Sequence, residues 1–351
     1  MTKRVVAVVD QTPVVVLATF NLPRIEFAYN TVPCSTNPLG IKGAGDAGAI
    51  GAPPALVNAV VDALAELGIE HLDMPLTPEA AVARAPRCRA AESGLTASRE
   101  RMLDVARRAA LAAGEAILHV YATAFDVRVK NDNTPVCEAD LASERIIMAK
   151  LREAFPEIPI ASEELVEAEG LPPCTARFWA VDPLDGTKEF IARNGEFAVN
   201  IALIEDGVPV LGIVHGPALG VTYAACGPGT ATRQLNGCGP QPIQARAPLP
   251  HGLVVIHSRS HENSRRLAEF LQDYHVRERK KCGSALKFGV IAAGEADLYP
   301  RFGTTMEWDT AAGQAILEAA GGRVDTLAGT RLTYGKPGLK NDGFLAWSRR
   351  S

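Results

Sequence analysis

The chain has 351 residues, of which 47% are hydrophobic, and its 36 basic and 40 acidic residues leave a formal net charge of −4 at pH 7. This length allows one or two domains with a full core, and the slightly acidic balance excludes the basic footprint of a nucleic-acid-binding protein. The seven scattered cysteines contain no Cys-x-x-Cys pair, which favours reduced thiols in a cytoplasmic protein and gives no zinc site.

Residues 1–86 differ in pattern from the rest of the chain. Asp10, Gln11 and Pro13 interrupt the apolar start, so a signal peptide is not predicted. No segment is long and apolar enough to span a bilayer, and nothing in the sequence indicates peripheral association with the inner membrane. We expect a strand over residues 14–18, a glycine-rich loop over 37–48 and a helix over 54–67. The glycines of the loop match G-x-G-x-x-G, but without a surrounding βαβ unit they predict no dinucleotide site.

Residues 20–78 resemble the C-terminal tail of the molybdenum-binding subunit of the xanthine dehydrogenase and carbon monoxide dehydrogenase family. The likeness lies in Asn-Pro-Leu-Gly-Ile-Lys-Gly-Ala-Gly-Asp-Ala-Gly at 37–48, Gly-Ala-Pro-Pro at 51–54 and Asp-Met-Pro-Leu-Thr-Pro at 73–78. That family carries a catalytic glutamate where this chain has Asp46, and the rest of its cofactor site is missing here. We therefore predict no redox activity and interpret the segment as a fused or mis-started remnant, loosely packed on the main domain, followed by a linker over 87–97.

The main domain is expected over residues 98–351. Its first helix begins at Ser98 and carries one apolar stripe from Met102 to Val120. A strand over 125–130 and a turn lead to Asp140, which occupies the N-cap position of a second helix over 141–155. Capping alone would explain Asp140, so its residue type does not by itself indicate catalysis.

The remaining elements alternate irregularly between strand and helix. Hydrophobic runs predict strands over 159–162, 177–181, 197–204, 208–214, 221–225, 253–257, 296–299, 322–325 and 344–347. Helical spacing predicts helices over 262–271, 283–294 and 310–320, and Asp206-Gly207 marks a hairpin turn. The one basic run, residues 277–281, is interpreted as a solvated strand or loop. This mixture favours a layered α/β sandwich over a doubly wound sheet.

Acidic side chains stand at three separate strand or helix ends. Asp182 and Asp185 belong to the turn Asp182-Pro-Leu-Asp-Gly-Thr187, Glu163-Glu164 ends an earlier strand, and Asp309 opens a later helix. The turn alone is an ordinary Pro-x-Asp-Gly turn. Together, the three groups supply the oxygen ligands that a hard cation requires, so they predict a Mg²⁺-dependent phosphatase.

Each acidic group has an expected place around the cations. Asp182 bridges two ions, Asp185 holds one of them and the Leu184 carbonyl holds the other. Glu163 completes the first site and Asp309 the second. Helix capping is compatible with the metal role of Asp309.

Other residues of the same motifs are candidates for substrate binding and proton transfer. The amides of Gly186 and Thr187 can hold phosphate oxygens. The Thr187 hydroxyl, bonded to Asp140, can orient the attacking water. Glu164 can assist as a base, although a supporting or surface role explains it equally well.

The motifs Glu163-Glu164, Asp182-Pro-Leu-Asp-Gly-Thr187 and Trp308-Asp-Thr-Ala-Ala-Gly313 resemble, in the same order, the three signatures of the inositol monophosphatase superfamily. The resemblance extends from residue 98 to the C-terminus. It implies an α-β-α-β-α sandwich, two or three Mg²⁺ ions and inhibition by Li⁺. It also implies the same metal ligands as above, and Thr187 and Asp140 fall where the family has its water-activating pair.

Within that superfamily, four further segments resemble the bacterial 3′(2′),5′-bisphosphate nucleotidases: residues 188–191, 194–201, 283–288 and 298–303. This likeness implies 3′-phosphoadenosine 5′-phosphate or its sulfated relative as substrate, and AMP or adenylyl sulfate as product. A second phosphate requires cationic side chains beyond the metals. Lys287 and Arg301 are the candidates, whereas Lys188 is interpreted as a solvated surface group.

Two alternatives remain open from the sequence. The first is an inositol-1-monophosphatase, and the second is a binding or redox-subunit fragment led by residues 1–86. The sequence leaves a homodimer open as well.

Overall fold

The computed structural model describes residues 5–9, 12–16, 86–123, 127–129, 135–170, 176–248, 250–259 and 264–349. The chain divides into two units, Met1–Cys88 and Arg89–Ser351. The described part of the first unit contains an antiparallel hairpin of β1 (Val5–Val9) and β2 (Thr12–Val16). The expected loop at 37–48 and helix at 54–67 lie outside the described residues, and no described helix is long and apolar enough to cross a membrane.

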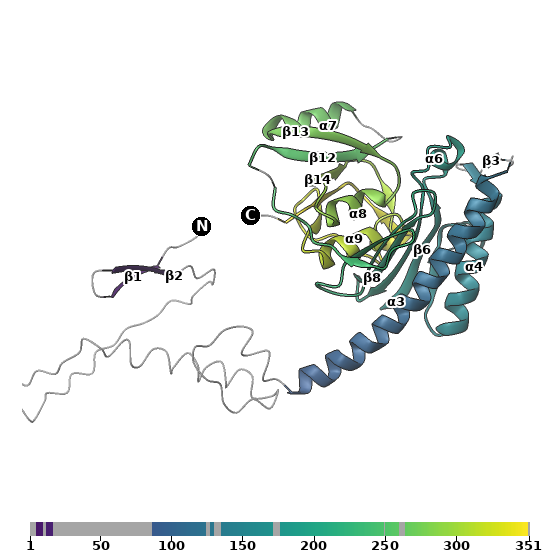
Figure 1. Ribbon diagram of the computed structural model, residues 1–351, viewed down its shortest axis with the longest axis horizontal. Coiled ribbons are helices and arrows are strands. Elements are labelled where there is room, and N and C mark those ends of the chain that lie inside the picture. Colours follow the sequence, from purple (N-terminus) through teal and green to yellow (C-terminus); the bar gives the residue numbers. More distant parts are fainter. Residues whose placement is uncertain are drawn as a thin grey trace, which may run out of the picture. The chain divides into compact units, whose positions relative to one another are not determined.

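The second unit is a five-layered α-β-α-β-α sandwich, as the sequence resemblance implies (Figure 1). Two helices cover the outer face of the first sheet: α3 (Pro86–Tyr121) and α4 (Glu138–Ala154). Between the two sheets lie α8 (Leu286–Ala292) and α9 (Ala311–Ala319), and α7 (Ser264–Phe270) covers the far side of the second sheet. The short helices α5 (Glu163–Glu169) and α6 (Thr187–Ile191) follow strand ends of the first sheet.

The first sheet has seven strands in the order β11-β10-β9-β8-β7-β6-β5. They are β5 (Ile160–Ser162), β6 (Arg177–Asp185), β7 (Ala198–Glu205), β8 (Val208–Gly216), β9 (Val221–Ala225), β10 (Thr232–Leu235) and β11 (Gln241–Pro242). Only the β5–β6 pair among these strands is parallel. The predicted β7–β8 hairpin is confirmed, because Asp206 and Gly207 both adopt the positive φ that a tight turn of this kind requires.

The second sheet has five strands in the order β13-β12-β14-β18-β16. They are β12 (Leu253–Ser258), β13 (Val276–Cys282), β14 (Leu298–Arg301), β16 (Arg323–Thr326) and β18 (Phe344–Trp347). The basic run predicted as a solvated strand or loop is the edge strand β13, and its residues are largely exposed. Charged residues on an edge strand discourage pairing with another chain.

The first helix buries the stripe that its sequence predicts. Met102, Ala106, Ala113 and Ile117 are all at most 4% exposed and pack with the outward-facing residues of the first sheet. The helix begins at Pro86, so the backbone is helical through residues 87–97, where we expected an irregular linker. Arginines and alanines in that segment are good helix formers, and this local propensity outweighs the missing apolar period.

The central helix α9 approaches the first sheet closely at Gly212 of β8. A Cβ atom built on Gly212 would lie 2.3 Å from the carbonyl oxygen of Ala312, so only glycine fits there. This contact fixes the beginning of α9, and with it Asp309, against the strands that carry the other acidic residues.

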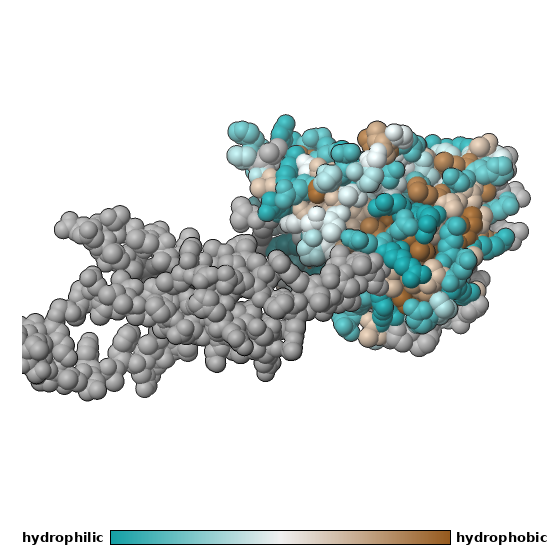
Figure 2. Space-filling model, turned by 60° about the horizontal axis from the view of Figure 1, so that its bottom comes forward, coloured by the Kyte–Doolittle hydropathy of each residue, from teal (hydrophilic) through white to brown (hydrophobic). Residues whose placement is uncertain are grey.

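Figure 2 shows a surface that is mainly hydrophilic, with hydrophobic residues in small groups.

Candidate active site

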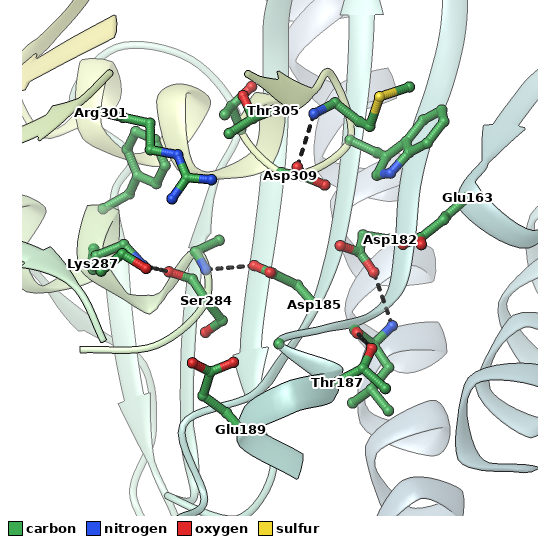
Figure 3. Close-up of a pocket in the computed structure, with 18 of the residues that line it drawn as sticks. Glu163, Asp182, Asp185, Thr187, Glu189, Ser284, Lys287, Arg301, Thr305 and Asp309 are labelled. Atoms are coloured by element: carbon green, nitrogen blue, oxygen red, sulfur yellow. Dashed lines mark hydrogen bonds between the residues drawn. The ribbon is translucent and has the colours of Figure 1, made fainter. Parts of the chain in front are cut away.

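A pocket of about 290 Å³ lies where the acidic motifs meet. The sequence-predicted residues that line it are Glu163, Asp182, Leu184, Asp185, Gly186, Thr187, Lys188, Lys287, Arg301 and Asp309. They come from the ends of β5, β6 and β14, the segment before α9, and α8. The fold thus brings together side chains separated by more than 140 positions in the sequence (Figure 3).

The turn at the end of β6 is shaped by hydrogen bonds around Pro183. The pairing of β6 with β7 is interrupted between Asp182 and Asp185. The Leu184 amide donates to Asp182 Oδ1 at 3.0 Å, and the Ser143 hydroxyl of α4 donates to the Pro183 carbonyl at 2.7 Å. These bonds fix the bulge and place both carboxylates at the pocket.

Three buried or half-buried aspartates face the same space, and burial raises the pKa of each. Asp182 is 2% exposed, and burial raises its pKa well above the ordinary value, with further repulsion from Glu163, Asp185 and Asp309. Burial likewise raises the pKa of Asp309 well above its ordinary value, with added repulsion from Asp185 and Glu163. The cluster is therefore electrostatically costly as it stands, and a cation would relieve that cost.

One oxygen of Asp185 is held by two donors. Asn200 Nδ2 of β7 donates to Asp185 Oδ2 at 3.1 Å, and the Ala285 amide donates to the same oxygen at 2.5 Å. Burial raises the pKa of Asp185, while the Lys287 ammonium and these hydrogen bonds oppose the rise. The second oxygen, Oδ1, stands on the side of the carboxylate that these two bonds do not occupy.

The donor set fits Mg²⁺. All four acidic groups and the Leu184 carbonyl offer oxygen, the ligand type that hard cations prefer. Among the described residues, no three His, Cys, Asp or Glu side chains already gather around a single point. Mg²⁺ usually keeps several waters and takes one or two carboxylates together with substrate phosphate oxygens, and carboxylates line this pocket.

Thr187 and Asp140 meet although they lie 47 positions apart. Thr187 Oγ1 is 3.5 Å from Asp140 Oδ1 and 3.3 Å from the Leu184 carbonyl oxygen. The expected N-cap role of Asp140 is wrong, because α4 begins at Glu138 and Asp140 lies within its first turn, 4% exposed. Its carboxylate faces the turn of β6 across the helix–sheet interface.

Asp309 also differs from the capping role considered for it. The N-cap position of α9 is occupied by Thr310, and Asp309 Oδ2 instead accepts the Met306 amide at 2.9 Å. This bond orients the carboxylate toward the pocket, as Figure 3 shows. The pKa of Asp309 is raised despite this hydrogen bond, since burial outweighs it.

The cationic candidates occupy different environments. Lys287 is 3% exposed, its ammonium is bonded to the carbonyl oxygens of Ser284 and Cys282, and it lies 4.9 Å from the centre of the Tyr299 ring. Arg301 Nε is buried and has no hydrogen-bond partner among the described residues. Lys188 is exposed at the pocket edge.

Sequence reasoning missed several residues of the site. The lining also includes Glu189, Ser258, Ser284, Ala285, Phe288, Tyr299, Thr305, Met306, Trp308, Thr310 and Phe344. Phe288 and Phe344 stack, and Tyr299 contacts both rings edge to face, with centroids 5.3–5.7 Å apart, so that the three rings form an aromatic cluster. Their sequence signal is that of ordinary core residues. Glu164, the expected auxiliary base, lies on α5 and is outside this lining.

Comparison with known proteins gives consistent matches. The sequence profile of the inositol monophosphatase family matches residues 98–346. The chain is 47% identical over 246 residues to a protein named 3′(2′),5′-bisphosphate nucleotidase CysQ from Escherichia coli O157:H7, covering 69% of this chain and 98% of that protein.

Solved structures agree with the sequence matches. CysQ from Bacteroides thetaiotaomicron is similar with a TM-score of 0.60 and 35% identity, over 72% of this chain and 98% of that chain. Inositol monophosphatase from Anabaena (Nostoc) sp. PCC 7120 is similar with a TM-score of 0.55 and 26% identity, over 71% and 91%. Because the profile spans most of the sequence and includes every acidic motif at the pocket, the chain belongs to the inositol monophosphatase family.

Proposed function

We propose that the protein is a Mg²⁺-dependent phosphomonoesterase that hydrolyses 3′-phosphoadenosine 5′-phosphate, and its sulfated form, to AMP or adenylyl sulfate plus phosphate. One observation carries the proposal: the chain covers 98% of the length of a 3′(2′),5′-bisphosphate nucleotidase at 47% identity. The four acidic groups that face the pocket supply oxygen ligands suited to the cation that such chemistry uses.

Glu163, Asp182, Asp185, Asp309 and the Leu184 carbonyl would hold the cations. Bound there, Mg²⁺ would neutralise charge on the transferring phosphoryl group and make water more acidic. The protein fixes these ligands in advance, since Asp182 and Asp185 are already bonded to backbone amides. Such preorganisation lowers the reorganisation cost of reaction.

The Thr187–Asp140 pair would handle the proton of the attacking water. When the Thr187 hydroxyl donates to Asp140, its oxygen lone pairs are available to accept a hydrogen bond from water. The Asp140 carboxylate can then receive the proton through Thr187 Oγ1. Amides at Gly186 and Thr187, at the start of α6, would hold phosphate oxygens, while Glu164 is half-buried outside the pocket lining and stays a weaker candidate.

The second phosphate would be bound on the side of the pocket away from the acidic cluster. Arg301 is the stronger candidate, because its Nε is buried at the pocket without a hydrogen-bond partner among the described residues. Lys287 contributes positive charge there, although its ammonium is already bonded to two carbonyl oxygens.

A substrate comparison tests the proposal. We expect purified protein with Mg²⁺ to release phosphate from 3′-phosphoadenosine 5′-phosphate at least about tenfold more efficiently, by kcat/KM, than from inositol 1-phosphate. Preference for the inositol ester would assign an inositol monophosphatase instead. Hydrolysis of neither ester, together with bound molybdenum, would favour a redox-subunit fragment led by residues 1–86. We further propose two or three ions per site, inhibition by Li⁺ and a cytoplasmic location, with a homodimer as the state to examine.

A further inference from the structure

An exposed ion pair joins the two sheets at the edge of the pocket. Glu196 lies in the loop between α6 and β7 of the first sheet, and Arg259 directly follows β12 of the second. The guanidinium binds the carboxylate through two hydrogen bonds, from Nε to Oε2 at 2.8 Å and from Nη2 to Oε1 at 2.7 Å. Paired, bidentate geometry of this kind is stronger than a single contact.

Glu196 makes a third contact that an ordinary surface ion pair lacks. Its Oε2 also accepts the backbone amide of Gly283 at 2.8 Å. The loop packs so closely there that a Cβ atom on Gly283 would lie 2.4 Å from the Glu196 carbonyl oxygen. Although burial opposes the shift, Arg259 and the Gly283 amide hold the pKa of Glu196 below its ordinary value. The carboxylate therefore stays charged and anchored to this loop.

The anchored loop reaches directly into the site. Ser284 has a φ of +47°, a conformation that costs a non-glycine residue roughly 1–2 kcal/mol and must be held by its surroundings. The next residue, Ala285, donates its amide to Asp185 Oδ2 at 2.5 Å. Ser284 of this loop and Cys282 at the end of β13 supply the carbonyl oxygens that bind Lys287. Release of Gly283 would let the loop relax and remove the amide that orients Asp185.

We propose that Glu196 and Arg259 are positioning residues that hold the loop of residues 283–287 in its binding-competent shape, and so set the affinity of the site for Mg²⁺ and for the phosphate ester. The inference rests on the proposed function, since it treats Asp185 as a cation ligand. A simple surface ion pair would contribute no more than about 1 kcal/mol to stability and would leave both affinities unchanged.

The chain contains a matched control. Arg331 binds Glu318 through Nε at 3.1 Å and Nη2, with side chains 48% and 18% exposed, against 41% and 19% for Arg259 and Glu196. Neither residue of the control pair lines the pocket. Loss of either carboxylate removes a bidentate ion pair and one further hydrogen bond, from the Gly283 amide to Glu196 or from Gln314 Nε2 to Glu318. Only Glu196 is bonded to the loop whose amide holds Asp185.

The test compares Glu196→Ala, Arg259→Lys and Glu318→Ala in the full chain. For each protein, the rise in Tm is measured as Mg²⁺ is added, and kcat and KM are measured at saturating Mg²⁺. For Glu196→Ala we expect the Mg²⁺ dissociation constant obtained from that rise in Tm and the KM to increase about tenfold each, with kcat reduced less than about threefold. Arg259→Lys, which keeps the charge without the second donor, should fall between it and wild type.

The outcomes separate the two hypotheses. If the Mg²⁺ affinity and KM of Glu196→Ala lie within about twofold of those of Glu318→Ala, the positioning role is overturned. Hydrolysis of the bisphosphate by the wild-type protein would still support the proposed function in that case. A wild-type protein that neither binds Mg²⁺ nor hydrolyses the bisphosphate would overturn the function itself. If Glu196→Ala does not fold, Glu196→Gln replaces it: its amide oxygen can still accept the Gly283 amide, but the ion pair with Arg259 is lost. We then expect a smaller rise in the Mg²⁺ dissociation constant and in KM, and values equal to those of Glu318→Ala would overturn the positioning role.

Discussion

At the scale of single residues, Asp182 illustrates a conflict between stability and the proposed activity. Burial of its carboxylate raises its pKa, and repulsion from Glu163, Asp185 and Asp309 raises it further. Only the Leu184 amide offsets that cost within the turn. A buried carboxylate with so unfavourable an environment is commonly retained for function, because its replacement by a neutral side chain would otherwise stabilise the protein.

Replacing Asp182 with asparagine is therefore expected to have opposite effects on the two properties. Asp182→Asn keeps an oxygen for the Leu184 amide and removes the repulsion, so the Tm of the Mg²⁺-free protein should rise. Hydrolysis should fall on the order of a thousandfold, since a bridging ligand is lost, and Mg²⁺ should no longer raise the Tm. Thermal unfolding with and without EDTA, alongside phosphate release, measures both.

Asp206→Asn provides the control for that variant. Asp206 lies in the β7–β8 turn with a φ of +48°, a conformation that asparagine tolerates. We expect wild-type hydrolysis and an unchanged response to Mg²⁺. If Asp182→Asn retained most of its activity, the cation cluster would not be the catalytic centre.

His215 provides a second prediction at this scale, away from the acidic cluster. It lies on β8 beneath α3, with Nδ1 2.9 Å from the Thr222 hydroxyl. Burial lowers its pKa from 6.5 to about 4. The unfolded chain takes up a proton below pH 6.5 while the folded chain does not until about pH 4, so stability is full above pH 6.5 and falls across this interval, by up to about 3 kcal/mol.

His215→Gln should flatten this part of the pH profile. Glutamine does not titrate and can still bond to Thr222, so the loss of unfolding free energy between pH 6.5 and 4 should be smaller than in wild type. Urea unfolding at several pH values gives the unfolding free energy of each protein. Subtracting one profile from the other cancels the contributions of all groups that the two proteins share. An identical slope in the two proteins would mean that His215 is protonated in the folded state.

At the scale of elements, α4 holds the ends of two strands, β5 and β6, in place. Asp140, Ser143 and Glu144 stand at i, i+3 and i+4, hence on one face of the helix. They contact Thr187, the Pro183 carbonyl, and the Ser162 hydroxyl with the Leu165 amide, respectively. Glu144 thereby supplies the cap that Ser162 does not provide for α5, whose first residue is Glu163.

Without the Glu144 side chain, the first turn of α5 should be held less firmly, so that Glu163 is still present but less well positioned. For Glu144→Ala we expect a loss of about 1–2 kcal/mol in unfolding free energy and a several-fold higher Mg²⁺ requirement, with kcat near wild type at saturating Mg²⁺. Activity titrated against Mg²⁺ and chemical denaturation check this. Glu153→Ala, nine residues along and exposed on the opposite face of α4, should change neither. An unaltered Mg²⁺ requirement in Glu144→Ala would limit Glu144 to helix capping.

At the scale of the whole molecule, the proposed catalytic residues and the matched family profile belong to the second unit. The profile covers residues 98–346, and the unit begins at Arg89. Both sheets, the hydrophobic core between them and the pocket lie in this unit. We propose that residues 1–86, including the segment that resembles a molybdenum-hydroxylase tail, are not required for phosphate hydrolysis.

Deletion of residues 1–85 tests this division. The truncated protein retains all of α3, so its buried stripe is preserved. We expect kcat/KM and Tm close to those of the full chain, measured by phosphate release and thermal unfolding. A loss of more than about tenfold in kcat/KM would instead assign the N-terminal segment a role in the site or in its stability.

The sequence by itself predicted the acidic residues that line the pocket and, through its family resemblance, the layered architecture. Asp182 and Asp185 are three residues apart on one turn, and strand and hairpin signals such as Asp206-Gly207 depend on neighbouring residues, so local patterns suffice to predict them. The same locality explains why the predicted apolar stripe of α3 is the face that the protein buries.

Only the tertiary structure decided which groups hold those ligands in place. The Ala285 amide that orients Asp185 is 100 positions away, and Ser143 reaches the Pro183 carbonyl across 40. Lys287, expected to bind substrate, is bonded to backbone carbonyls because its loop folds around it. Contacts of this kind follow from how helices pack on sheets, and a side chain's residue type does not specify its distant partner.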